Sequence, residues 1–172
     1  MTYASTKTYG HEVGLSACFR QWRSTHSHCR FLHGYALSVH LKFEADDLDE
    51  RNWVVDFGGL KNLKSWLQDT FDHKTVVAED DPLLDWFHRG HEQGLLDLVI
   101  LPAVGCERFA ELVWAQANAW LHNNGYAPRC RVVEVGGGVI HRGGHGARHG
   151  DGACAETVDV RRVGGGRLAQ KR

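Results

Sequence analysis

The most regular hydrophobic pattern in the chain is an alternation that begins at Leu37. The segment LSVHLKFEA places apolar side chains at every second position, with serine, histidine, lysine and glutamate between them. Because successive side chains of a strand point to opposite faces of a sheet, this segment predicts a strand with one buried face and one polar face. The N-terminal segment TYASTKTYGHEVGLSACF alternates less clearly and predicts another strand.

Two later segments have the spacing of amphipathic helices. In WVVDFGGLKNLKSWLQDTF, a short apolar run is followed by helical spacing from Leu60 to Phe71, and Asp56 is placed to cap this first helix. In CERFAELVWAQANAWLHNNG, an apolar stripe predicts a second helix, which the Asn-Gly pair at its end stops.

The remaining segments complete the fold class. The segment DDPLLDWFHRGHEQGLLDLVILP is longer than a connection needs and predicts an insertion, at about residues 75–103, with a short helix and an extended run. Towards the end, RCRVVEV predicts a strand, GGG a turn and VIHRG the returning strand. The order ββααββ predicts an α+β domain over residues 1–143, with a four-stranded antiparallel sheet and two helices packed on one face. Residues 144–172 are rich in Gly, His and Arg and predict a loose C-terminal extension.

Composition narrows the class of protein. The 172 residues suffice for one packed core, and the formal net charge of -1 gives no reason to expect nucleic acid as a partner. No apolar run has membrane length and the N-terminus lacks an export pattern, so we expect a cytoplasmic protein that makes no membrane contact. The five cysteines lack a CxxC pair, which favours reduced thiols over disulfides. The twelve histidines include two clusters, which are His26, His28 and His33, and then His141, His145 and His149.

Several polar residues could carry chemistry, and each also has a structural explanation. Cys29 is a candidate thiolate, although a lone cysteine beside a strand is more often a small buried side chain. Asp72 could orient His73 as a general acid or base, or His73 could be a helix C-terminal residue favoured by the dipole. Glu134, in the apolar run VVEV, could accept two hydrogen bonds from a guanine-like ring or could face outward. Glu107 is also explained as an acidic residue in the first turn of a helix.

Taken in order, these residues and their neighbours form the motif set of a known family. The set consists of Cys29, LHG at 32–34, WVVDFGGLK at 53–61, FDH at 71–73, CERFAELVW at 106–114, Glu134 and IHRG at 140–143. It resembles the successive blocks of the 6-pyruvoyltetrahydropterin synthase / 6-carboxytetrahydropterin synthase family, from about residue 3 to residue 143. The resemblance implies the T-fold, in which the subunits of a homo-oligomer, expected to be a hexamer, close their sheets into a barrel with active sites between them.

The resemblance also implies an activity and roles for residues. The implied enzyme is a carbon-oxygen lyase that acts on 7,8-dihydroneopterin triphosphate and forms 6-carboxytetrahydropterin, on the route to queuosine and other deazaguanines. Cys29 would be the base that removes a side-chain proton, and Asp72 with His73 would handle the second proton. Glu134 would anchor the pterin, and Glu107 would be a second pterin-site residue. The alternatives are a T-fold protein that binds a pterin or purine without the family reaction, and a non-catalytic paralogue.

The sequence departs from the family at the metal site. The family binds zinc through three histidines, one on the first strand and two in a His-Gly-His on the second, and the zinc polarises oxygens of the substrate. Here His33 matches the pattern, Tyr35 replaces the second histidine of the pair, and counting back along the chain puts the first-strand position near Cys18. The expected cofactor is therefore zinc at an altered site, with His33, Cys18 and His28 as candidate ligands. His26 or one of the three later histidines could substitute.

Overall fold

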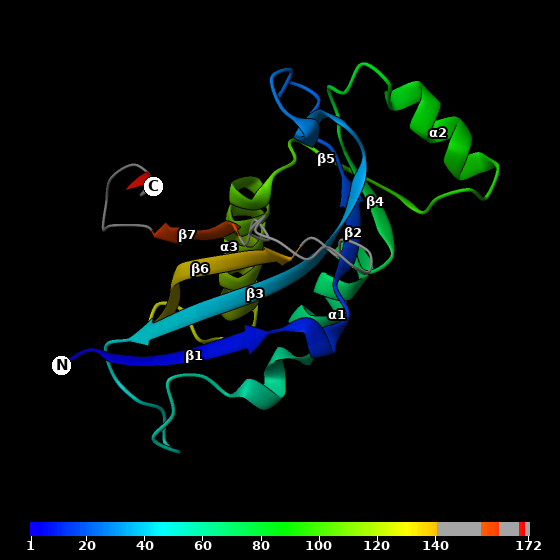
Figure 1. Cartoon of the computed structure of the whole chain (residues 1–172). Helices are drawn as coiled ribbons and strands as arrows, with labels where there is room; N and C mark the ends of the chain where they lie inside the picture. Colours follow the sequence, from blue (N-terminus) through cyan, green and yellow to red (C-terminus); the bar gives the residue numbers. More distant parts are fainter. Residues whose placement is uncertain (141–155, 162–168, 171–172) are drawn as a thin grey trace.

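The computed structural model describes residues 1–140, 156–161 and 169–170 (Figure 1). The strands of the described part are β1 (Tyr3–Tyr9), β2 (Ser16–Phe19), β3 (His33–Ala45), β4 (Lys74–Ala78), β5 (Leu98–Leu101), β6 (Cys130–Ile140), β7 (Glu156–Arg161) and β8 (Ala169–Gln170). The helices are α1 (Lys61–Phe71), α2 (Leu84–Glu92) and α3 (Cys106–Asn123), with the short 3-10 helices η1 (His11–Val13), η2 (His28–Arg30) and η3 (Phe57–Leu60). None of the described helices is long and apolar enough to cross a bilayer.

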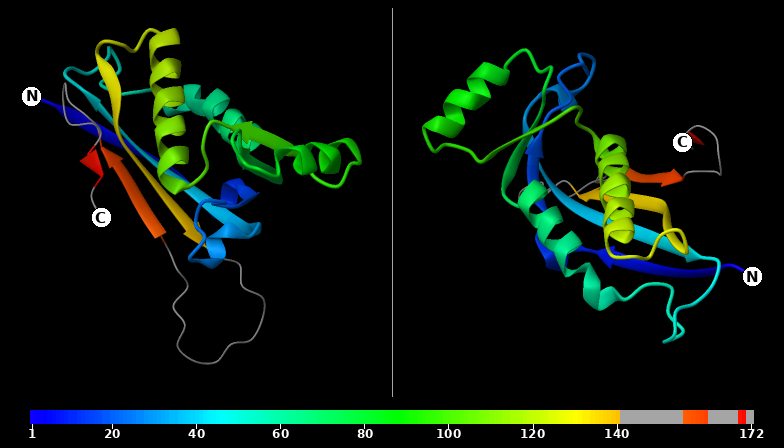
Figure 2. Two further views of the ribbon diagram at one scale, coloured as in Figure 1. Left: turned by 90° about the horizontal axis from the view of Figure 1, so that it is seen from above. Right: turned by 180° about the vertical axis from the view of Figure 1, so that it is seen from behind.

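The centre of the fold is β3, the strand predicted from the alternation. One of its edges pairs with β2 and then with β1, and the other edge pairs antiparallel with β6. Alternate residues of β3 are buried, and α1 and α3 pack on that side of the sheet (Figure 2). The opposite side carries polar residues such as His40, whose Nδ1 lies 2.8 Å from the Thr8 hydroxyl. The predicted α+β class, the first strand pair and the two helices on one face are therefore confirmed.

The segment predicted to be an insertion, about residues 75–103, is part of the sheet and extends it. Its short helix is α2 and its extended run is β5, as the sequence predicted. β4 pairs parallel with β2, and β5 pairs parallel with β4, so the sheet is mixed and larger than the predicted antiparallel four strands. α2 projects beyond this end of the sheet (Figure 2). The parallel pairs were not predicted because nothing in the short apolar runs specifies the neighbour that they pair with.

The predicted turn at GGG is wrong. β6 runs straight through Gly136, Gly137 and Gly138, which pair with β3 on one side and with β7 on the other. Backbone hydrogen bonding on both edges compensates for the weak strand preference of glycine. The strand that returns beside β6 is β7, from the region predicted to be a loose extension. Of the predicted returning strand VIHRG, residues 141–143 lie outside the described residues, as do the three later histidines.

Candidate active site

Cys29 lies in η2, within the connection between β2 and β3. Its backbone N–H donates to the Ser27 hydroxyl at 3.1 Å, which caps η2, and its carbonyl accepts a hydrogen bond from the Gln21 N–H at 2.8 Å. The residue is exposed, and its thiol is free. The structural explanation of Cys29 as a buried strand residue therefore fails, and the residue is placed where a solute can reach it.

An open pocket of about 580 Å³ adjoins Cys29. Tyr35 of β3 and Glu107 of α3 also line it. The structure therefore brings together Cys29 and Glu107, two of the predicted site residues. Trp22, Arg23 and Asp80 also line the pocket, and the sequence interpretation missed all three. Hydrogen bonds from Arg23 and Trp22 lower the pKa of Asp80. The volume lies within the range of about 300–1,000 Å³ that is usual for small-molecule sites.

His33 and Tyr35 form a hydrogen-bonded pair at the start of β3. His33 Nδ1 lies 2.8 Å from the Phe31 carbonyl oxygen, which can only accept, so Nδ1 carries the proton. In the neutral ring Nε2 then accepts from the Tyr35 hydroxyl, at 2.5 Å. The Tyr35 ring stacks on Phe19 of β2 with centroids 4.0 Å apart. Both nitrogens of His33 are thus engaged with protein groups.

The strand register shows which first-strand residue shares a face with His33. Phe19 pairs directly with His33, whereas Cys18 pairs with Gly34. Directly opposed residues of antiparallel strands point to the same side, and successive residues alternate. Cys18 therefore lies on the opposite face from His33, with its sulfur 3.8 Å from the position that a Cβ on Gly34 would take. The position across from His33 belongs to Phe19, which counting along the chain missed by one residue.

The residues present do not fit the zinc site that the family implies. Phe19 has no donor atom, the Tyr35 hydroxyl is bonded to His33, and Cys18 points away from both. His28, the remaining candidate, lies in η2 with its ring 6.4 Å from that of Phe31. Within the described part of the chain, no three His, Cys, Asp or Glu side chains form a group that could hold a metal ion. The predicted ligand set is therefore not assembled there.

Asp72 and His73 lie beside a different pocket. Asp72 ends α1, and its Oδ1 lies 2.7 Å from His73 Nδ1, so the carboxylate orients the ring as predicted. His73 has a left-handed backbone with φ of 56°, held by its N–H donating to the Ser16 carbonyl at 2.7 Å. Its side chain is 86% exposed and lines a pocket of about 340 Å³ that also includes Gly34 and Tyr35. Cys29 does not line this pocket, so one chain does not combine the two predicted catalytic groups in one cavity.

Glu134 is remote from Cys29 within one chain. It pairs with Lys42 on β3, and positions 33 and 42 of that strand are about 30 Å apart at 3.3 Å per residue. Its other neighbour in the sheet is Arg161 of β7. The role of Glu134 as a pterin anchor stays a prediction, and it requires a site to which a second subunit contributes.

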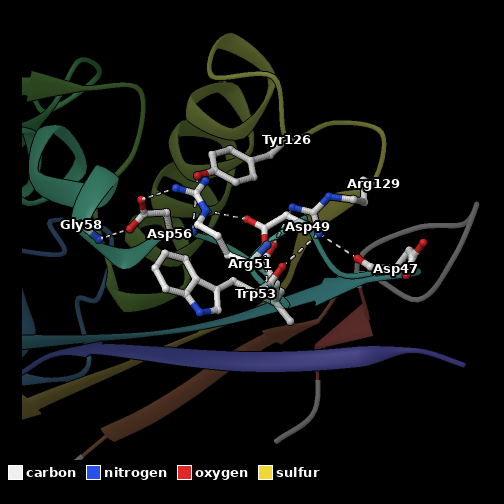
Figure 3. Close-up of polar contacts among 9 residues, drawn as sticks. Asp47, Asp49, Arg51, Trp53, Asp56, Gly58, Tyr126 and Arg129 are labelled. Atoms are coloured by element: carbon white, nitrogen blue, oxygen red, sulfur yellow. Dashed lines mark hydrogen bonds and ion pairs between the residues drawn. The ribbon is translucent and has the colours of Figure 1, made fainter.

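The motif WVVDFGGLK is held in place by a polar network before α1 (Figure 3). Asp49 Oδ1 accepts from the Trp53 N–H at 2.9 Å, and this bond lowers the pKa of Asp49. The Arg129 guanidinium donates to the Trp53 carbonyl at 3.3 Å. Asp56 Oδ1 accepts from the Gly58 N–H at 2.8 Å, so Asp56 caps η3, which leads directly into the predicted helix. The network holds the exposed Trp53 beside a second open pocket of about 580 Å³.

Comparison with known proteins places these features in a family. A 54-residue segment is 39% identical to the 6-carboxy-5,6,7,8-tetrahydropterin synthase of Rickettsia typhi, covering 31% of this chain and 39% of that protein. The chain thus matches about two fifths of the length of its curated relative. Among solved structures, an uncharacterized protein from Wolinella succinogenes superposes with a TM-score of 0.64 at 19% identity, over 80% of this chain and 92% of the other. The 6-pyruvoyl tetrahydropterin synthase of Plasmodium falciparum superposes with a TM-score of 0.56 at 14% identity, over 81% and 91%.

The structural neighbours establish the fold, and the family follows from the sequence. The sequence model of 6-pyruvoyl tetrahydropterin synthase matches residues 10–136, which include the Cys29 loop, the Asp72-His73 pair and all of α3. The chain therefore belongs to the 6-pyruvoyl tetrahydropterin synthase family.

Proposed function

We propose that the protein is a lyase of the 6-carboxytetrahydropterin synthase type that acts on 7,8-dihydroneopterin triphosphate, in queuosine and deazaguanine biosynthesis. The observation that carries the proposal is the exposed Cys29 thiol at a pocket of about 580 Å³. In this reaction a base removes a proton from a side-chain carbon, and the carbon–oxygen bond to triphosphate breaks. Cys29, as the thiolate, is the base that takes the proton.

His73 is the second proton-transfer group. The Asp72 carboxylate, 2.7 Å from Nδ1, keeps the proton on that nitrogen and leaves Nε2 to exchange a proton with the substrate. The high exposure of the ring, 86%, suits a group that completes a site on another subunit. We therefore propose a homo-oligomer in which Cys29 of one subunit and His73 of a neighbour act on the same substrate. Glu134 reaches the pterin in the same way, from a neighbouring chain.

A subunit-mixing experiment tests this arrangement. Cys29→Ala and His73→Ala oligomers are each expected to be inactive, because every site lacks one group. Co-expressing the two variants gives hybrid oligomers in which roughly a quarter of the sites, one half times one half, hold both groups. We expect release of triphosphate to recover to that fraction of the wild-type rate.

The control carries both substitutions in one chain, co-expressed with the wild type, and reports any change caused by mixing itself. Hybrids of the two single variants that stay inactive, although mass spectrometry shows that both chains are present, would refute a shared site. A wild-type protein that binds the pterin triphosphate and releases no triphosphate would reject the lyase itself.

The altered donor set supports one alternative function. With Phe19 and Tyr35 at the positions that the family fills with histidine, the chain could bind a pterin or purine without the family reaction. No step of the proposed reaction uses the zinc that the family implies, because the donor set around His33 does not fit it. Calorimetric titration with the pterin triphosphate, followed by product analysis of the same sample, separates the two functions: binding with turnover supports the lyase, and binding alone supports the alternative.

A further inference from the structure

The inserted segment forms an ion pair with the residue that follows β2 and leads into the Cys29 loop. Arg20, the first residue after β2, donates to Asp81 through Nε at 2.9 Å and through Nη2 at 2.5 Å. The side chains of Arg20 and Asp81 are 17% and 1% exposed, so the ion pair lies largely out of water. Asp81 Oδ1 also accepts from the Leu83 N–H at 2.8 Å, just before α2. A paired two-point contact of this kind fixes direction as well as distance.

A second acidic residue, Asp80, binds the next residues of the same segment, Trp22 and Arg23. Asp80 accepts from the Trp22 indole N–H at 3.2 Å and from Arg23 Nη2 at 2.5 Å. The Arg23 guanidinium also lies 4.2 Å from the centre of the Trp22 ring. The Arg23 and Asp80 side chains are 63% and 48% exposed, so this contact is weaker than the buried pair beside it.

Gln21, the residue after Arg20, connects this segment to Cys29 by a hydrogen bond. The Gln21 N–H donates to the Cys29 carbonyl at 2.8 Å, and its side-chain amide donates to the Val104 carbonyl at 3.1 Å. Asp81 follows β4 near the start of the insertion, and Val104 lies directly after its end, before α3. The chain at the two ends of the insertion therefore contacts the neighbouring residues Arg20 and Gln21. Gln21 in turn makes a direct hydrogen bond to Cys29.

We propose that Asp81, through its ion pair with Arg20, is a positioning residue that fixes Cys29 in the active-site pocket. The insertion is then a support of the site, because its first turn supplies the buried carboxylate. Without that carboxylate, the segment is held by the Val104 bond of Gln21 and by the more exposed contacts of Asp80, and the loop that carries Cys29 has more than one available conformation. The catalytic consequence rests on the proposed role of Cys29, whereas the structural consequence can be measured without any turnover.

The test compares Asp81→Asn with Asp85→Asn. The Asp81→Asn substitution keeps an acceptor for the Leu83 N–H and removes the charge that holds Arg20. Asp85 is an exposed acid in the first turn of α2 and controls for loss of negative charge from the insertion. In Asp81→Asn, amide hydrogen exchange of residues 21–31 is expected to accelerate by at least about tenfold, while exchange in α3 is unchanged. In Asp85→Asn both regions should exchange as in the wild type.

Kinetics supply the readout that a purely structural role would not move. Loss of positioning lowers kcat for triphosphate release by at least about tenfold and leaves KM within about twofold. Arg20→Lys keeps the charge and loses the two-point contact, so it should give the same pattern in a milder form and serves if Asp81→Asn does not fold. The double variant should be no worse than Asp81→Asn alone, because both changes break one contact.

Unchanged exchange of residues 21–31 in both Arg20→Lys and Asp81→Asn would overturn the proposal, and so would faster exchange with a wild-type kcat. If the wild-type protein releases no triphosphate, the proposed function fails, and the exchange experiment still decides whether Asp81 fixes the loop.

Discussion

Replacing Phe19 and Tyr35 with histidine tests whether these two side chains occupy the family's metal position. With His33, the double variant Phe19→His plus Tyr35→His has three imidazoles on one face of the β2–β3 pair. Histidine nitrogens are good zinc ligands and three of them suffice for a protein site with one open position. We expect the double variant to bind one zinc ion per chain, and the wild type to bind none through these residues.

The magnitude follows from what the two rings contact. Phe19 and Tyr35 are 4% and 8% exposed, and Phe19 has ring contacts with Tyr35 at 4.0 Å and with Phe109 at 5.0 Å. Each aromatic contact contributes about 0.5–1.5 kcal/mol beyond burial, so loss of the two ring contacts should cost the metal-free variant about 1–3 kcal/mol of stability, in addition to the lost apolar burial. Zinc at a hundred times its dissociation constant restores about 2.7 kcal/mol. For a chain of this size each kcal/mol shifts Tm by about 2–4 °C, so zinc should raise the Tm of the variant by about 5–10 °C.

The assay is thermal unfolding with and without zinc, together with elemental analysis after dialysis. Phe19→His alone is the control, because it offers two imidazoles and one phenol. A double variant that binds no zinc would refute the assignment of the metal position. A wild-type protein that holds one zinc ion per chain, with the same rise in Tm, would show that other residues supply the ligands.

Four further changes have expected outcomes. Cys29→Ala should abolish triphosphate release and leave the dissociation constant of the pterin, measured by titration, nearly unchanged; activity equal to the wild type would remove Cys29 from the reaction. Glu134→Ala should raise that dissociation constant, and an unchanged affinity would reject Glu134 as the pterin anchor. Asp56→Ala should cost about 1 kcal/mol of unfolding free energy in urea, because the cap of η3 is lost. Burial raises the pKa of Tyr9 to about 12, so its contribution to stability is complete below pH 10 and is lost as the pH rises towards 12. Wild-type stability should therefore fall by up to about 2–3 kcal/mol across that window, as measured by urea unfolding at each pH, and Tyr9→Phe should lack this part of the loss.

Much of the fold was accessible from sequence because β3, α1 and α3 each have one buried face. Period-two alternation marks β3, and helical spacing marks α1 and α3, since burial on one side imposes the pattern directly. The extent of the sheet was not accessible in the same way. Three glycines normally indicate a turn, and only hydrogen bonding to strands on both sides keeps them extended in β6.

For the candidate site, too, the sequence showed some features and only the fold showed others. Motifs made Cys29, Asp72 and His73 candidates, because a residue type in a fixed local context is visible in the sequence, and their catalytic roles stay predictions. Cys18 does not share a face with His33, since counting residues gives the distance along a chain and not the face of a strand, and a shift of one residue reverses the face. The contact of Arg20 with Asp81 joins residues 61 positions apart, and only the fold brings them together.

The turn after α2 is a suitable place to attach a label to the protein. Gly94 has φ of 71°, and a Cβ at this position would meet nothing within 4 Å, while the neighbouring Leu95 is 70% exposed. Because the bonds to the Cys29 loop come from Asp80, Asp81 and Val104, chain inserted between Gly94 and Leu95 leaves each of those bonds in place. A fluorophore or an immobilisation tag attached at this turn would report on the protein, or tether it to a surface, without touching the pocket.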